Sequence, residues 1–222
     1  MAVKRTPFDG DQTRLALITA AEELFADEGV EATSIRSINK AAGVAPAAVH
    51  YHFGSKDALL DAVLARRGGV ILPQILTRAG ELVERRRRPT AHEIVDCVAV
   101  PYLELLADDP VGGGRWLRII AQLSLAQDVR MSRQGDPAAR VLKELCEKAY
   151  PKADPETVPA LVALALNTLI QMIGRTPGDA DAEAEAAYRT QLVDFVAGGL
   201  DAILRAASHP STASSSPSAE SA

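Results

Sequence analysis

The sequence predicts an all-α protein, and three observations support this fold class. Aromatic residues make up only 4% of the 222 residues, so alanine and aliphatic side chains must fill the core. Alanine and leucine are strong helix formers, and apolar residues recur at helical spacing along most of the chain. No stretch of alternating polar and apolar residues is bounded by hairpin turn signals, so no strand is predicted.

The chain divides into four segments that differ in composition and pattern. We expect a flexible tail over residues 1–11, a compact helical unit over 12–56, a larger helical unit over 57–207 and a disordered tail over 208–222. The last segment is rich in serine, alanine and proline and has no hydrophobic period, so it cannot bury a core.

Two helices open the compact unit. The first covers residues 12–28, where the apolar side chains share one face, and Gly29 ends it. Thr33 or Ser34 caps the second helix, which is short and ends at Gly43.

A third short helix and a long fourth helix follow. The third covers Ala45 to Phe53, with Pro46 in its first turn, where proline is tolerated. Ser55 caps the fourth helix. Because Gly43 allows a tight reversal between two short helices, the second and third helices form a predicted helix-turn-helix.

The larger unit is also predicted to be helical, and its prolines mark boundaries or kinks. The expected helices are 71–88, 91–107, 114–128, 137–150, 155–174 and 182–206. We expect Gly112-Gly113-Gly114 to form a loop between two of them.

The net charge of -5 argues at first against nucleic-acid binding. The local charge is different. Between Thr33 and Lys56 the basic residues are Arg36, Lys40 and Lys56, and no acidic residue occurs. Phosphate binding needs such a local basic footprint, and an acidic remainder limits binding elsewhere on the surface.

Other function classes lack their signatures. No secretory signal is evident, and the longest apolar runs are interrupted, so we expect a cytoplasmic protein without a membrane partner. Cys97 and Cys146 are expected to be reduced and structural. No metal-ligand spacing, phosphate loop or nucleophile–base pattern can be placed, so no catalytic residue, metal or cofactor is predicted.

Residues 12–64 resemble the N-terminal domain of the TetR family of regulators. The match runs through Ala20-Ala21-Glu22-Glu23-Leu24-Phe25, Gly29, Ala32-Thr33-Ser34, Ile38, Ala41-Ala42-Gly43-Val44, His52-Phe53, Ser55-Lys56 and Leu59. The third helix reads Ala47-Ala48-Val49-His50-Tyr51-His52-Phe53-Gly54-Ser55-Lys56, which looks like a branch of the family with the tyrosine one place later than usual.

The resemblance implies that the third helix enters the major groove of DNA. By resemblance, phosphates are contacted by Ser34, Arg36, Tyr51, His52 and Lys56, and bases are faced by Pro46, Ala47 and His50. Thr33 and Ala45 complete the predicted DNA face. Two simpler roles stay open: His52 could cap helix-end carbonyls, and the ring of Tyr51 could pack on Pro46.

The resemblance also implies that the residues from about 70 onward bind a small effector and form a homodimer. The candidate ligand-binding residues are Tyr102, Trp116, Arg118, Gln122, Asn167 and Gln171. Hydrogen bonding in the core or at the dimer interface remains the alternative role for the amides. The aliphatic composition and the branch resemblance favour an apolar effector, such as a fatty-acyl or other lipid-like molecule.

The dimer prediction has independent support in the sequence, because the last two helices are apolar around more of their circumference than one core face requires. The predicted interface residues are Val162, Leu166, Leu169, Leu192, Phe195, Val196, Leu200 and Ile203. A larger monomeric core is the alternative.

The sequence therefore predicts a ligand-responsive regulator, most simply a repressor that binds a palindromic operator in double-stranded DNA and releases it when the effector binds. Two alternatives stay open. One is a helical DNA-binding scaffold or regulator without a ligand, and the other is an enzyme with an accessory DNA-binding domain.

Overall fold

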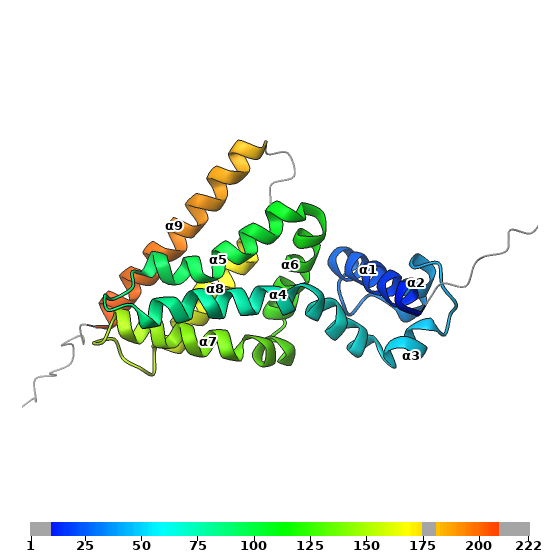
Figure 1. The fold of residues 1–222 in the computed structure, drawn as a ribbon, viewed down its shortest axis with the longest axis horizontal. Helices are drawn as coiled ribbons and strands as arrows, with labels where there is room; N and C mark the ends of the chain where they lie inside the picture. The colour runs from blue at the N-terminus through cyan, green and yellow to red at the C-terminus, as the bar shows by residue number, and fades with distance from the viewer. Residues whose placement is uncertain (1–9, 175–180, 209–222) are drawn as a thin grey trace, which may run out of the picture.

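The computed structural model describes residues 10–174 and 181–208, and this part of the chain folds into nine helices without a strand, which confirms the all-α prediction. The helices are α1 (Gly10–Glu28), α2 (Ile35–Ala41), α3 (Ala48–Phe53), α4 (Lys56–Glu84), α5 (Ala91–Asp108), α6 (Pro110–Leu125), α7 (Val129–Ala149), α8 (Val158–Ile173) and α9 (Ala182–Ala207). Figure 1 shows α1–α3 grouped at one end of an elongated molecule, with α5–α9 at the other end.

The small end has its own core, built from apolar side chains that point between α1, α2, α3 and the start of α4. The fully buried members are Leu17, Phe25, Ile38, Val49 and Leu59. Burying one such side chain contributes roughly 1.5–3 kcal/mol, so a few of them hold the short helices α2 and α3, which would not be stable alone.

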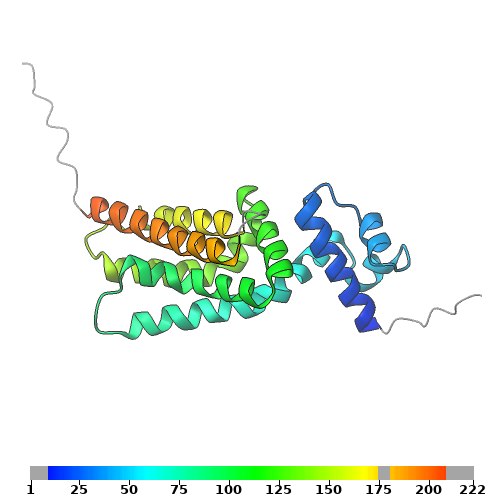
Figure 2. The same cartoon turned by 90° about the horizontal axis from the view of Figure 1, so that it is seen from above.

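Helix α4 joins the two ends, and its 29 residues run through Pro73 without a break. The predicted boundary before residue 71 is therefore wrong. Ile71 and Ile75 are buried on either side of the exposed proline. Their packing holds the helix together against the roughly 3 kcal/mol that an interior proline costs. As a result, one continuous element enters both cores (Figures 1 and 2).

The triple glycine was predicted as a loop, but it lies in the first turns of α6. Asp109 caps this helix by accepting a hydrogen bond from the Gly112 N–H at 2.9 Å, and Pro110 occupies its first turn. A Cβ at Gly112 would lie 2.1 Å from Arg67 Nη2, and one at Gly113 would lie 3.0 Å from Cγ of Leu105. The glycines thus permit close packing of α6, which the sequence pattern could not reveal.

Smaller differences concern helix ends. Helix α3 begins at Ala48, so Pro46 lies in the preceding turn and not in the helix. Helix α7 begins at Val129, eight residues before its predicted start at 137. Helix α1 begins at Gly10, inside the predicted tail. The rest of both predicted tails lies outside the described residues, except Ser208, which caps α9.

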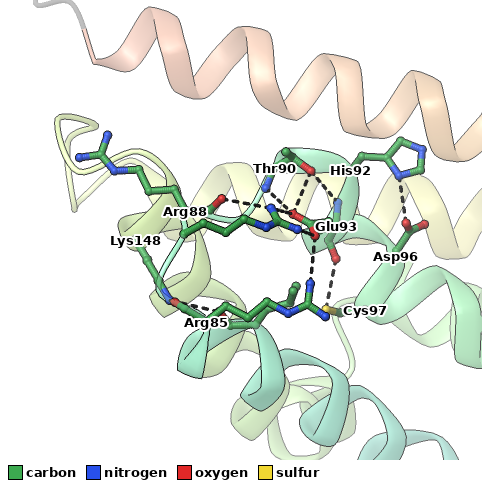
Figure 3. A network of polar contacts seen from close by, with 10 residues as sticks. Arg85, Arg88, Thr90, His92, Glu93, Asp96, Cys97 and Lys148 are labelled. Atoms are coloured by element: carbon green, nitrogen blue, oxygen red, sulfur yellow. Dashed lines mark hydrogen bonds and ion pairs between the residues drawn. The ribbon is translucent and has the colours of Figure 1, made fainter.

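A polar network ties the end of α4 to α5 and α7 (Figure 3). Glu93, in the first turn of α5, pairs with Arg85 and Arg87 and completes a capping box with Thr90. Hydrogen bonds from Arg87 and from the Thr90 backbone lower the pKa of Glu93 to about 2. Lys148 of α7 donates to the carbonyls of Val83 at 2.6 Å, Leu82 at 3.1 Å and Arg85.

Lys148 therefore satisfies several carbonyls at the C-terminus of α4, and Lys148→Met is expected to lower the free energy of unfolding by about 1–3 kcal/mol. Urea denaturation followed by circular dichroism measures the change. Lys143→Met is the matched control, because Lys143 is on the same helix and pairs with Glu147 at the surface. Equal effects of the two substitutions would contradict the proposed cap.

Candidate nucleic-acid interface

The turn between α2 and α3 is held by side-chain hydrogen bonds as well as by the core. Ser34 caps α2 in a capping box with Ser37, and Gly43 has the positive φ of 66° that was expected for the reversal. Asn39 is buried, and its amide donates to Pro46 O at 2.6 Å and accepts from Val49 N at 3.2 Å. Sequence reasoning missed Asn39, whose only signal was a polar residue beside the buried Ile38.

With this support, one side of α3 and the turn before it faces solvent. The exposed predicted residues are Ala45, Pro46, Ala47, His50 and Tyr51. Tyr51 is 86% exposed, and its ring meets that of His52 edge to face at 5.0 Å between centroids. Ser34 and Arg36 at the start of α2 are also exposed. Seven of the ten predicted DNA-contacting residues are thus exposed at the start of α2, in the turn before α3 and on α3 itself.

The prediction that Thr33 belongs to the DNA-contacting face was wrong. Its side chain is buried, and its hydroxyl lies 2.8 Å from Gly29 O and 3.2 Å from Leu24 O. This hydroxyl stabilises the turn between α1 and α2 and is not presented to a ligand.

Lys56 has a double role in the structure. Its ammonium donates to Val30 O at 2.9 Å and to Thr33 O at 3.2 Å. Because an ammonium has three N–H groups, one remains for a phosphate. The side chain therefore anchors the turn between α1 and α2 as well as adding positive charge.

The simpler role considered for His52 belongs to His50. The ring of His50 contacts the carbonyl of Gly54 at the end of α3, at 3.1 Å from Nδ1. The ring of His52 instead meets that of Tyr51 edge to face and that of Phe53 at a tilt, with centroid distances of 5.0 and 6.5 Å.

Arg14 is a basic residue beside this face that the sequence analysis missed. Its guanidinium carbon lies 5.1 Å from the centroid of the Phe53 ring, a cation–π geometry that holds an exposed positive charge next to the end of α3.

Ion pairs connect α1 to the large helical unit. Arg115 of α6 pairs with Glu23 at 2.6 Å, and Arg118 pairs with Asp27 at 3.1 Å. One turn later, Gln122 donates to the carbonyl of Ala26 at 3.3 Å. This row joins α6 to the C-terminal end of α1.

The most buried contact in this region centres on Arg67 of α4. Its Nη2 lies 3.1 Å from Glu22 on α1 and 2.8 Å from Asp109 at the start of α6. Glu22 is only 3% exposed. The Gly112 N–H and the Arg67 guanidinium hold the pKa of the Asp109 carboxyl below its usual value. Three helices therefore meet at one guanidinium.

The six candidate ligand-binding residues do not gather in one cavity. Arg118 and Gln122 face α1, as described above. The indole N–H of Trp116 donates to Leu64 O at 3.2 Å, and the Trp116 ring lies 6.3 Å from that of Tyr102, whose burial raises its pKa to about 12. Gln171 donates to Ala121 O at 2.8 Å, and Asn167 is exposed on α8.

An apolar cavity does lie elsewhere in the large unit, between α5, α7, α8 and α9. Its lining consists of Ile94, Val95, Leu142, Val162, Ala165, Leu166, Leu169, Val196 and Leu200. About 10 Å³ of it admits a water-sized sphere, which is room for about one water. The sequence analysis had assigned five of these side chains to a dimer interface.

The prediction of a dimer interface was therefore wrong for the residues that are buried inside one copy. Val162, Leu169, Leu192, Val196 and Leu200 are buried within one copy of the chain. Phe195 and Ile203, by contrast, are 73% and 42% exposed, and Leu164 on the adjacent α8 is 56% exposed. Helix α8 packs directly against α9, so two adjacent helices each carry exposed apolar side chains.

Two absences hold for the part of the chain that the structure describes. No helix there has the length and apolar character needed to cross a membrane. Within the same residues, no cluster of three or more histidine, cysteine, aspartate or glutamate side chains is arranged to hold a metal ion.

Comparisons with known proteins agree with this architecture. Residues 17–63 match the family model described as bacterial regulatory proteins of the tetR family, and residues 96–199 match the tetracyclin repressor-like C-terminal domain. The two matches follow each other in the order of the two structural units and together cover more than half of the chain.

Individual relatives are distant. The chain is 30% identical over 127 residues to the HTH-type transcriptional repressor AcnR of Corynebacterium glutamicum, across 56% of this chain and 66% of AcnR, so it spans just under two thirds of that relative. It is similar in fold to AmtR of Mycobacterium smegmatis, with a TM-score of 0.57, 21% identity and coverage of 93% and 96% of the two chains. For the fatty acid degradation regulator FadR of Bacillus halodurans these values are 0.59, 19%, 89% and 96%. The two family models match the N-terminal helix-turn-helix unit and the C-terminal helical domain in turn. The chain therefore belongs to the TetR family of bacterial regulatory proteins.

Proposed function

We propose that this protein is a transcriptional repressor that binds a palindromic operator as a homodimer and releases it when a small apolar molecule binds the large helical unit. The observation that carries the proposal is the exposed face of α3. Asn39 hydrogen-bonds the turn before α3 and its first residues, and Arg67 of α4 links the small helical unit to the large one.

The DNA contacts proposed for this face follow from its chemistry. Small side chains at Ala45 and Ala47 let the backbone approach the floor of the major groove. Arg36, Tyr51 and Lys56 supply groups for phosphates around it. The acidic remainder of the chain disfavours other orientations on DNA.

Homodimerisation is proposed through the outer face of α8 and α9. Small residues at Gly198, Gly199 and Ala202 accompany Phe195 there and allow two helices to approach closely. A two-fold axis would place the two α3 helices on half-sites about one helical turn of DNA apart, roughly 34–36 Å.

The proposed effector site is the apolar cavity between α5, α7, α8 and α9. Its lining carries no charged or hydrogen-bonding side chain, which suits an aliphatic chain better than a polar ligand. FadR of Bacillus halodurans, a fatty acid degradation regulator by its title, is similar in fold and gives the lipid-like class further support. Because the cavity has room for only about one water, binding of a larger molecule must move the helices around it.

Such a movement can reach the DNA face through α4 and α6. Both helices touch α1 by ion pairs, so a shift of either one changes the position of α1–α3 relative to the second copy. A half-site separation that no longer matches the operator would then release the DNA.

Tyr51→Ala and Arg36→Ala are expected to weaken binding to operator DNA by about 1–3 kcal/mol each, or roughly 5- to 150-fold. Arg36→Ala should also reduce the slope of log affinity against log salt by about one unit, since one phosphate contact is lost. Fluorescence anisotropy measures both quantities, with DNA selected from a random library by the wild-type protein.

Arg86→Ala is the matched control. Arg86 is an exposed arginine just beyond the C-terminus of α4, and this long helix starts next to α3 and runs away from it (Figure 1). Its substitution should leave affinity unchanged. If Tyr51→Ala and Arg36→Ala bind as tightly as the control, the assigned DNA face is wrong. If the protein selects no DNA at all, the proposed function is wrong.

A further inference from the structure

His50 is the one residue of the α3 face whose polar side chain is itself fixed by the backbone. Nδ1 of its ring lies 3.1 Å from the carbonyl oxygen of Gly54. The Gly54 N–H in turn donates to the carbonyl of His50 at 3.0 Å. Gly54 has a φ of 80°, a conformation that favours glycine, and this turn directs its carbonyl back to the ring.

The contact with Gly54 determines where the proton of the neutral ring resides. A carbonyl oxygen can only accept a hydrogen bond, so Nδ1 must be the donor. In a neutral imidazole the other nitrogen then carries a lone pair and no proton. Nε2 of His50 makes no hydrogen bond with any residue that the structure describes, and the side chain is exposed. His50 therefore presents a free acceptor on the DNA-facing surface.

An acceptor distinguishes the bases in the major groove. Adenine offers an N6 amine and cytosine an N4 amine, whereas the major-groove edges of guanine and thymine carry acceptors without a donor. An acceptor at this position can thus accept a hydrogen bond from adenine or cytosine. Opposite guanine or thymine, the ring nitrogen of His50 would face another acceptor, and no hydrogen bond could form.

The other exposed residues of α3 and of the turn before it offer few groups that can distinguish one base from another. Ala45, Pro46 and Ala47 carry no hydrogen-bonding side-chain group, and they can contact only apolar features such as the thymine methyl. The hydroxyl of Tyr51 both donates and accepts, so it discriminates less than the ring nitrogen does.

We infer that His50 reads one base of each half-site as a hydrogen-bond acceptor, so that the operator carries an adenine or a cytosine at the position facing α3. This inference rests on the proposed DNA-binding function and adds to it the chemical class of the base that is recognised.

The test starts with DNA selected from a random library by the wild-type protein at pH 8. Each adenine or cytosine of a half-site is then replaced, one at a time, by purine or by 2-pyrimidinone, which lack the exocyclic amine. We expect one position per half-site where the replacement weakens wild-type binding by about 5- to 10-fold, the effect of one hydrogen bond. At that position the same replacement should have no effect on His50→Ala.

His50→Lys is the second arm. An ammonium donates only, so this variant should select guanine at the same position, whose N7 and O6 accept. Arg86→Ala, outside the proposed DNA face, is the control, and it should keep the wild-type base preference.

The outcomes separate the two hypotheses. If wild type selects no sequence, the DNA-binding function fails. If it selects a sequence but the amine replacements affect wild type and His50→Ala equally, or if His50→Lys keeps the wild-type base, the reading of an amine by His50 is wrong while DNA binding stands.

Discussion

Arg67→Met is expected to lower the free energy of unfolding by about 3–5 kcal/mol, because it leaves the carboxylate of Glu22 buried without its partner. The side chain of Glu22 is 4% exposed and that of Arg67 is 13% exposed, so water cannot replace the lost charge. Asp109 also loses its partner, but its side chain is 46% exposed and contributes less.

Thermal and urea denaturation measure this loss. For a chain of this size about 2–4 °C of melting temperature accompanies each kcal/mol, so a decrease of roughly 6–20 °C is expected. Replacing both partners, with Glu22→Met added to Arg67→Met, should recover part of the stability, since no buried charge is then left unpaired.

Arg66→Met is the matched control. Arg66 precedes Arg67 on the same helix and lies 3.6 Å from Glu22, but its side chain is 37% exposed. Its substitution should cost less than about 1 kcal/mol. Equal destabilisation by the two substitutions would show that Arg67 is not the partner that Glu22 depends on.

Phe195→Glu is expected to dissociate the proposed dimer, raising its dissociation constant by about 1000-fold or more. A central aromatic residue of an interface can contribute about 4 kcal/mol, and a two-fold axis introduces the substitution, and its charge, twice. Because Phe195 is 73% exposed in one copy, each copy should keep its helical fold. DNA binding should weaken as well, since each monomer would contact only one half-site.

Analytical ultracentrifugation measures the association, and circular dichroism checks the fold. Leu125→Glu is the control, because Leu125 at the end of α6 is an equally exposed apolar residue, 80% accessible, on an element outside the α8–α9 face. A Phe195→Glu protein that stays dimeric at micromolar concentration would rule out the α8–α9 face as the interface.

Local sequence signals predicted a large part of this structure. Ser34 and Ser55 cap α2 and α4 as expected, and the turn at Gly43 adopts a positive φ. These features depend on residues within one helical turn of each other, so their chemistry can be recognised without knowing the fold. The ordered run of such signals over residues 12–64 is also what identifies the family.

Features that depend on distant partners could not be predicted in this way. Pro73 lies inside α4 because Ile71 and Ile75 are held by the core. The triple glycine begins a helix because α6 packs closely against Arg67 and Leu105.

The assignment of helix faces depended on the fold most of all. Helix α8 is apolar around most of its circumference, so the sequence alone could not tell which side faces a cavity and which faces outward. The tertiary structure places Val162 and Leu169 in the interior and leaves Leu164 outside. The sequence by itself determined the serine caps of α2 and α4, the glycine turn between α2 and α3, and the resemblance to the TetR family. Only the tertiary structure decided what each side of a helix contacts, because those contacts come from residues far away in the chain.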